Sequence, residues 1–148
     1  FLYMQKEIYL SSDHGGFNLK EQIFVYLCRK NFNVHNLGTN SLDSVDYPDY
    51  SRLLVNKIKS GRNAYGILIC GTGIGMSISA NRDDQIRAAL CTDTKMAKLS
   101  RQHNNANVLV LGGRILNVNM AKKIVDVFID SDFEFGRHEL RLNKLKNK

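Results

Sequence analysis

The chain has 148 residues, of which 43% are hydrophobic and 24% charged, values typical of a soluble globular domain and not of a disordered or fibrous chain. A domain of this size buries about two thirds of the surface that its unfolded chain exposes, so a core forms without metal or disulfide staples. Lys and Arg number 21 against 14 Asp and Glu, and the net charge of +7 attracts phosphate esters, nucleic acid or acidic membranes.

Cysteine usage and hydropathy favour a reducing cytoplasmic location. Cys28, Cys70 and Cys91 are irregularly spaced, without a Cys-x-x-Cys pair or the Cys/His spacing of a metal site. No stretch approaches the ~20 apolar residues of a membrane span, and no signal-peptide pattern opens the chain. We therefore expect free thiols, no metal site and no membrane partner. Because the chain begins with Phe1, two interpretations of residues 1–5 stay open: a non-native leader before Met4, or a flexible start.

The first half of the chain alternates short apolar runs with longer amphipathic ones, the pattern of repeated β-α units. Pro48, the only proline, suits the start of a helix, because its missing N–H falls in the unsatisfied first turn. The predicted elements are a strand over 7–12, a helix over 18–31, a strand over 34–37, a turn-rich segment over 38–50 and a helix from Pro48 to about Lys59.

The second half continues the alternation. Residues 65–70 are apolar almost throughout, as a strand covered on both faces should be. The predicted elements are a strand over 65–70, a glycine loop over 71–75, a helix over about 76–81, a strand over 86–91, a helix over 94–103, a strand over 108–111, a helix over 117–130 and a basic C-terminal helix over 137–148.

Strand-helix-strand repeats joined by short loops predict an α/β fold with a five-stranded parallel sheet and helices on both of its faces. No linker or low-complexity segment interrupts the series, so we expect residues 1–148 to form a single domain. Ligands of such folds bind at the carboxyl ends of the strands, which directs attention to the loops that follow them.

The loop after the third predicted strand contains Gly71, Gly73 and Gly75. Glycines let the backbone approach a ligand and turn its N–H groups inward, and a helix N-terminus follows, so an anion or oxyanion is expected there. The dinucleotide fingerprint fails because Met76 replaces its third glycine, and the Gly-Lys-Ser/Thr ending of a nucleotide-hydrolase loop is absent. The loop alone fits a tight strand-to-helix turn equally well.

Cys70 ends the strand before this loop, where a thiolate would be stabilised, whereas Cys28 and Cys91 are interpreted as small apolar residues. Thr72 could donate its hydroxyl to a developing oxyanion. His14 and His103 lie among polar residues, and either suits a general acid near neutral pH.

Three further side chains have two interpretations each. Asp13, beside His14, could hold a hydroxyl or orient an imidazole. Arg137 and Arg141 are four residues apart, so they share one helix face and would make a phosphate clamp. A solvated basic tail is the alternative.

Five motifs occur along the chain: Ser-Asp-His-Gly-Gly at 12–16, Asp-Tyr-Pro at 46–48, Ile-Cys-Gly-Thr-Gly-Ile-Gly at 69–75, Ser-Arg-Gln-His-Asn at 100–104 and Gly-Arg-His at 136–138. Together these motifs resemble those of type B ribose-5-phosphate isomerases. They follow the order of that family and extend over nearly the whole chain, from about Lys6 to the C-terminal helix.

The resemblance implies a Rossmann-like three-layer sandwich that assembles as a homodimer or a dimer of dimers, with the active site between two subunits. It also implies an aldose-ketose isomerase without a cofactor or metal, which interconverts D-ribose 5-phosphate and D-ribulose 5-phosphate through an enediolate. Cys70 would be the base, His103 and Asp13 would assist ring opening, and Thr72 would stabilise the enediolate oxygen. The residues that it implies for substrate binding are Asp13, His14, Gly71, Thr72, Gly73, Ile74, Gly75, Asn104, Arg114, Arg137 and Arg141.

Variation within the resembled family bears on mechanism and specificity. Some relatives replace the cysteine and use a glutamate in the glycine loop, but Cys70 with Met76 after the loop matches the cysteine type. Related galactose-6-phosphate isomerases divide the cysteine and the His-Asn motif between two different subunits, whereas this chain has both. A self-sufficient enzyme of ribose type is therefore favoured. Allose 6-phosphate differs only in length, so pentose or hexose phosphate stays open, as does dimer or tetramer.

Two other classes of function make different predictions for this sequence. A nucleotide-binding module with this fold predicts saturable binding without turnover, but the missing third glycine counts against it. A nucleic-acid binder predicts affinity that falls steeply with salt. The basic residues are scattered and no aromatic stripe accompanies them, so nucleic acid is not an expected partner.

Overall fold

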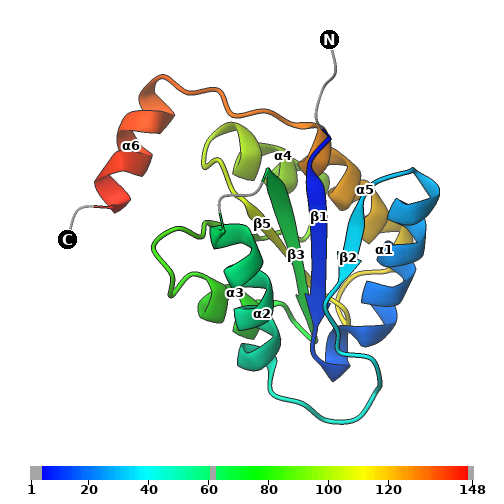
Figure 1. Ribbon diagram of the computed structural model, residues 1–148. Coiled ribbons are helices and arrows are strands. Elements are labelled where there is room, and N and C mark those ends of the chain that lie inside the picture. Colours follow the sequence, from blue (N-terminus) through cyan, green and yellow to red (C-terminus); the bar gives the residue numbers. More distant parts are fainter. Residues whose placement is uncertain (1–4, 61–62, 147–148) are drawn as a thin grey trace.

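In the part of the chain that the computed structural model describes, residues 5–60 and 63–146, five parallel strands form one sheet (Figure 1). The two interpretations of the chain start concern mainly residues 1–4, which lie outside the described residues. Across the sheet the order is β2-β1-β3-β5-β4, which confirms the predicted five-stranded parallel sheet. The strands are β1 (Glu7–Ser12), β2 (Val34–Asn36), β3 (Ala64–Cys70), β4 (Ala88–Leu90) and β5 (Val108–Gly112).

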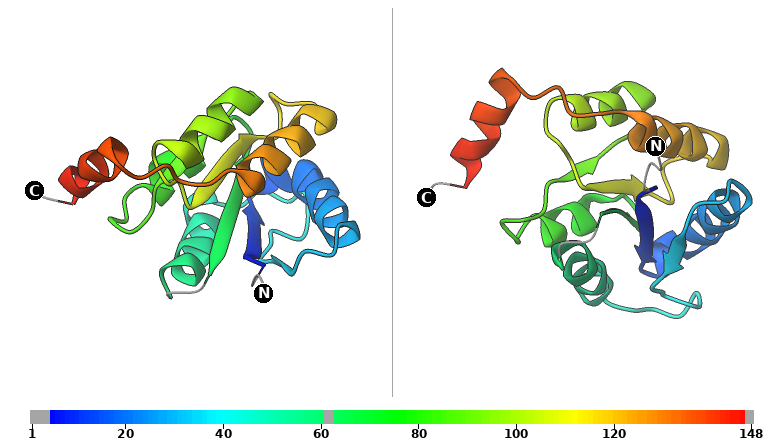
Figure 2. Two further views of the ribbon diagram at one scale, coloured as in Figure 1. Left: turned by 90° about the horizontal axis from the view of Figure 1, so that it is seen from above. Right: turned by 45° about the horizontal axis from the view of Figure 1, so that its top comes forward.

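Helices cover both faces of this sheet and complete a three-layer sandwich (Figure 2). One core lies between the sheet and α1, α4 and α5, and the other lies between the sheet and α2 and α3. The helices are α1 (Phe17–Arg29), α2 (Tyr47–Lys59), α3 (Ile74–Ala80), α4 (Thr94–Gln102), α5 (Val118–Asp130) and α6 (Arg137–Leu145), with a 3-10 turn, η1 (His14–Gly16), before α1. None of these described helices has the length and hydropathy needed to cross a membrane.

The two cores follow from the alternation of side chains along each strand. In β1, Ile8 and Leu10 pack in the core under α1 and α5, whereas Tyr9 between them packs under α2. Strand β3 is buried at every position, as its apolar sequence predicts. Its last residue, Cys70, belongs to the core on the α2 and α3 side.

Most predicted elements are confirmed within two residues, and the differences have physical causes. Helix α3 begins at Ile74, so the end of the glycine loop forms its first turn. The strand predicted over 86–91 is reduced to β4, because β4 lies at the sheet edge and pairs only with β5. Pro48 lies in the first turn of α2, as predicted.

The basic C-terminal helix forms as α6 and projects away from the sheet, after the extended segment 131–136 (Figure 1). Within α6, His138 is the buried residue. Leu140 and Leu145 are 67% and 69% exposed, so much of the apolar surface of α6 faces solvent in the isolated chain.

Candidate active site

The loops that follow β1, β3 and β5 meet at the carboxyl edge of the sheet. The N–H groups of Gly113 and Arg114 donate to the carbonyl oxygens of Cys70 and Gly71, at 2.8 and 2.9 Å. A Cβ added to Gly15 would lie only 3.0 Å from the backbone nitrogen of Gly71. Because β1 and β3 are adjacent and lead to opposite halves of the sheet, these loops lie at the switch point where such folds bind ligands.

Cys70 lies beneath the glycine loop with its sulfur turned toward a backbone donor. Cys70 is 5% exposed, and its Sγ accepts a hydrogen bond from the N–H of Gly73 at 3.2 Å. Gly73 has a φ of +85°, a conformation that glycine adopts readily. Thr72 is exposed beside it, and its Oγ1 accepts from the N–H of Ile74 at 3.2 Å. A negative charge that forms on this sulfur or next to it is therefore met by hydrogen-bond donors.

Asp13 and His14 follow β1 on the same edge and are both held by backbone groups. The Oδ1 of Asp13, a buried residue, accepts from the N–H of Gly16 at 3.1 Å. The Nδ1 of His14 accepts from the N–H of Val45 at 3.2 Å. In the neutral imidazole the other nitrogen, Nε2, then carries the proton and can donate to a phosphate or hydroxyl oxygen.

Arg114 adds positive charge above the glycine loop. A Cβ added to Gly71 would lie 3.4 Å from Nη1 of Arg114, so the guanidinium passes over the loop backbone. The first group of expected site residues, which we call the carboxyl-edge group, is therefore brought together by the fold. Its members are Asp13, His14, Cys70, Gly71, Thr72, Gly73, Ile74, Gly75 and Arg114.

A buried lysine that the sequence analysis did not single out supports this edge. Lys20 is 0% exposed, and its Nζ donates to Oδ1 of Asn36 at 2.8 Å. The same oxygen accepts from the N–H of Gly38, whose carbonyl accepts from Ser12 at the end of β1. Burial lowers the pKa of Lys20, and the carboxylate of Glu21 opposes this shift. Helical periodicity could have indicated that Lys20 is buried, because Lys20 lies on the apolar face of α1.

The remaining expected residues lie elsewhere on the chain. His103 follows α4 and precedes β5, whereas Cys70 pairs with Gly112 at the far end of β5. The strand between them covers roughly 13 Å. Within one chain Cys70 therefore lies at the carboxyl ends of the strands, whereas His103 lies at their amino ends.

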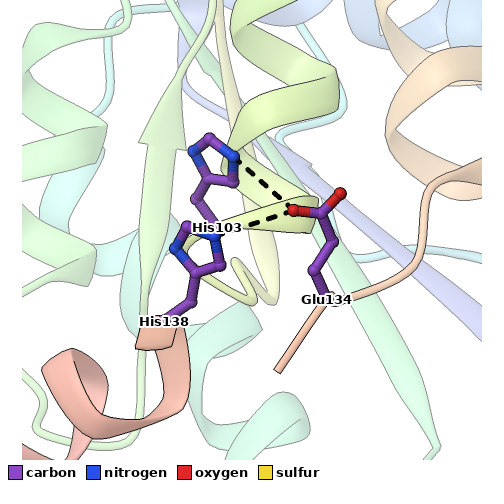
Figure 3. A group of neighbouring side chains, drawn as sticks. All are labelled: His103, Glu134 and His138. Carbon is purple, nitrogen blue, oxygen red and sulfur yellow. Dashed lines mark ion pairs between the residues drawn. The ribbon is translucent and has the colours of Figure 1, made fainter. Parts of the chain in front are cut away.

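His103 stands in a cluster with Glu134 and His138 (Figure 3). Sequence reasoning missed Glu134, and it noted His138 only as part of the Gly-Arg-His motif. The imidazoles of His103 and His138 are stacked, with ring centroids 4.2 Å apart and planes 11° apart. Oε1 of Glu134 lies 3.7 Å from Nε2 of His103 and 3.6 Å from Nε2 of His138. Burial lowers the pKa of His138, as do the nearby charges of His103 and Arg137. Glu134 lies four residues before His138 but outside α6, so helical periodicity does not link the two in the sequence.

Asn104, Arg137 and Arg141 complete this second group, which we call the amino-edge group. Asn104 is exposed and borders a cavity of about 500 Å³ between β4 and α6. Arg137 and Arg141 flank His138 on α6 and are exposed. The structure thus places part of the expected site at the carboxyl ends of the strands and the other part at their amino ends.

Comparisons with known proteins agree on one family. The chain matches the family described as Ribose/Galactose Isomerase over residues 8–145. Ribose-5-phosphate isomerase B of Escherichia coli strain K12 is 41% identical over 140 residues, which are 95% of this chain and 94% of that protein.

Solved structures give the same result over nearly the full length. A ribose 5-phosphate isomerase from Thermotoga maritima is 49% identical, with a TM-score of 0.96 over 98% of this chain and 100% of that chain. Ribose-5-phosphate isomerase B from Mycoplasma genitalium, solved with bound ribulose-5-phosphate, is 44% identical, with a TM-score of 0.92 over 97% of this chain and 96% of that chain. The similarity in sequence, length and fold shows that the chain belongs to the ribose/galactose isomerase family.

Proposed function

We propose that the chain interconverts D-ribose 5-phosphate and D-ribulose 5-phosphate, with Cys70 as the proton-transfer base. The observation that carries the proposal is the position of the Cys70 sulfur, 3.2 Å from the N–H of Gly73, under a glycine loop at the switch point of the sheet. Relatives with this activity in their names support the substrate, as does the ribulose-5-phosphate bound to the Mycoplasma genitalium protein.

The chemistry needs one base and one oxyanion site. From the open-chain aldose, the Cys70 thiolate takes the proton from C2, and the electron pair of that C–H bond forms the enediolate. The same thiol then delivers the proton to C1, while a proton moves between the two oxygens. The N–H groups of the glycine loop and the hydroxyl of Thr72 stabilise the negative oxygen of the intermediate.

Residues of both groups supply ring opening and phosphate anchoring in this proposal. His103 and Asp13 assist proton movement as the furanose opens, and Asn104 contacts a sugar hydroxyl. His14 and Arg114 hold the phosphate together with Arg137 and Arg141.

The separation of the two groups within one chain supports an active site between two subunits. A homodimer, or a pair of dimers, places the amino-edge group of one copy against the carboxyl-edge group of another. Exposed apolar side chains border the glycine loop and suit such a contact: Ile74, Ile78 and Ile115 are 54%, 53% and 60% exposed. The apolar surface of α6 is available to the same contact.

The test compares Cys70→Ala with Cys28→Ala in a coupled assay of ribose 5-phosphate conversion that contains chelator. Cys28 is a matched control, because it is a free thiol exposed on α1. We expect metal-independent turnover by the wild type and by Cys28→Ala, and a loss of at least about a hundredfold in kcat for Cys70→Ala. A Cys70→Ala variant that retains the wild-type rate would rule out the cysteine mechanism.

Specificity for the pentose and a cytoplasmic location stay predictions. The pentose prediction is checked by kcat/KM for ribose 5-phosphate against allose 6-phosphate, and a preference for the hexose would reverse it. The presence of both the cysteine and the His-Asn motif in one chain supports the pentose.

A further inference from the structure

We propose that His103, Glu134 and His138 form a binding site for a divalent transition-metal ion such as Zn²⁺, and that the bound ion inhibits the isomerase. The three side chains come from the end of α4, the segment 131–136 and α6, and they meet at one place (Figure 3). One potential ligand atom from each lies within 4.8 Å of the others. Two imidazoles and a carboxylate are a ligand set that zinc enzymes use.

A second, independent observation at His138 points to a ligand. The residue is 6% exposed, and its Nε2 has no hydrogen-bond partner among the described residues. Its distance of 3.6 Å from Oε1 of Glu134 exceeds that of a hydrogen bond. Buried polar atoms are almost always hydrogen-bonded, so this ring nitrogen calls for a closer partner than the carboxylate of Glu134 at 3.6 Å.

The spacing of the donor atoms is close to that of a coordination sphere. Ligands about 2.1 Å from a tetrahedral Zn²⁺ are roughly 3.4 Å from one another. The observed N···O separations of 3.6 and 3.7 Å are slightly larger. The two imidazoles are nearly parallel, so one ring must turn before both nitrogen atoms face a single ion. The side chain of His103 is 37% exposed and has room for that rotation.

The backbone around the cluster is already fixed, which limits the rearrangement needed. The N–H of Glu134 donates to the carbonyl of Gln102 at 3.0 Å, and this bond ties segment 131–136 to α4. The Glu134 side chain is 50% exposed, so water can complete the coordination from the solvent side. Arg137 and Arg141 are the neighbouring positive charges, and they oppose the ion by electrostatic repulsion.

Metal binding would inhibit the enzyme because it occupies the imidazole that ring opening uses. A nitrogen of His103 that is bound to Zn²⁺ cannot take up or release a proton. The proposed isomerisation uses no metal ion, so a bound ion would regulate or poison the reaction and would not support it. The proposal of a metal site stands on its own geometry, and only the inhibition depends on the proposed function.

Direct binding to the full-length chain, stripped of metal by chelator and without substrate, tests the site. Zn²⁺ is titrated by calorimetry, and Co²⁺ is followed by its visible absorption as a tetrahedral complex. We expect one ion for each chain. His138→Ala and Glu134→Gln should each weaken binding by about tenfold or more, since even the loss of an outer-shell partner costs about 10–100-fold. His35→Ala removes a histidine on β2, far from the cluster in sequence, and should bind like the wild type.

The exposed position of Glu134 makes Glu134→Gln informative even if the buried His138 proves necessary for folding. Binding that is unchanged in Glu134→Gln and abolished in Cys70→Ala would place the ion on the thiol and overturn the proposal. In the isomerase assay, the Zn²⁺ concentration for half inhibition should rise by about tenfold or more in Glu134→Gln, in parallel with its weaker binding. Because binding is measured without turnover, its result is independent of whether the chain isomerises ribose 5-phosphate.

Discussion

At the scale of the residue, the candidate site depends on backbone segments that approach more closely than side chains allow. A Cβ added to Gly16 would lie 2.4 Å from the carbonyl oxygen of Ile69, a separation that real structures do not tolerate. A Cβ added to Gly71 would lie 3.4 Å from Nη1 of Arg114, an ordinary contact with a flexible side chain. The two glycines border the same loops but differ in the space around them.

Gly16→Ala should therefore lower the free energy of unfolding by about 2 kcal/mol or more, since overpacking typically costs about 1–3 kcal/mol. Gly71→Ala, the matched control, should stay within about 0.5 kcal/mol of the wild type. Urea unfolding of the two variants and the wild type measures both changes. Equal losses in the two variants would show that the contact with Ile69 does not set the requirement for glycine.

The candidate residues at the carboxyl edge could be named from the sequence, but their contacts could not. Cys70 and Thr72 stood out because a strand end and a glycine loop are local patterns. The bond from Val45 to His14 joins residues 31 positions apart, and no local pattern indicates it. Glu134 was missed for a similar reason, because His103 reaches it only through the folded chain.

At the scale of the element, α4 positions His103 at its C-terminal end and depends on a cap at its start. The Oδ1 of Asp93 accepts from the N–H of Met96 at 2.8 Å, and so satisfies one of the free donors of the first turn. Helix α2 also begins after an aspartate, Asp46, but the side chain of Asp46 makes no such bond. The two aspartates therefore occupy the same position in two helices with different contacts.

Asp93→Ala should lower the free energy of unfolding by about 1 kcal/mol, the usual effect of losing an N-cap. Asp46→Ala should have less than about half of that effect, because no cap hydrogen bond is lost. Chemical unfolding followed by circular dichroism compares them. A larger loss for Asp46→Ala would contradict the assignment of the cap in α4.

Element types were predictable because each follows from a local period, but the order of the strands was not. The apolar pattern identifies Val108–Gly112 as a strand but does not indicate which strands pair with it. In the structure this strand, β5, lies between β3 and β4. The sheet-edge position of β4, which shortens it, follows from this order. The opposite placement of Cys70 and His103 also became visible only with the strand order and the direction of α4.

At the scale of the whole molecule, one chain holds the candidate site residues in two separate groups. Cys70 lies at the carboxyl edge of the sheet, whereas His103 and the arginines of α6 belong to the amino-edge group. Helix α6 projects from the body with exposed leucines (Figure 1). These features are explained together if a second copy of the chain completes each site.

The most direct test joins two inactive chains in one dimer. Cys70→Ala and His103→Ala chains are produced together with different affinity tags, and the mixed dimer is purified on both tags and assayed with ribose 5-phosphate. In a two-fold symmetric dimer with shared sites, one site of the mixed dimer carries both substitutions and the other is intact, so about half of the wild-type activity is expected. A mixed dimer as inactive as its two parents would contradict an active site that combines Cys70 of one subunit with His103 of the other.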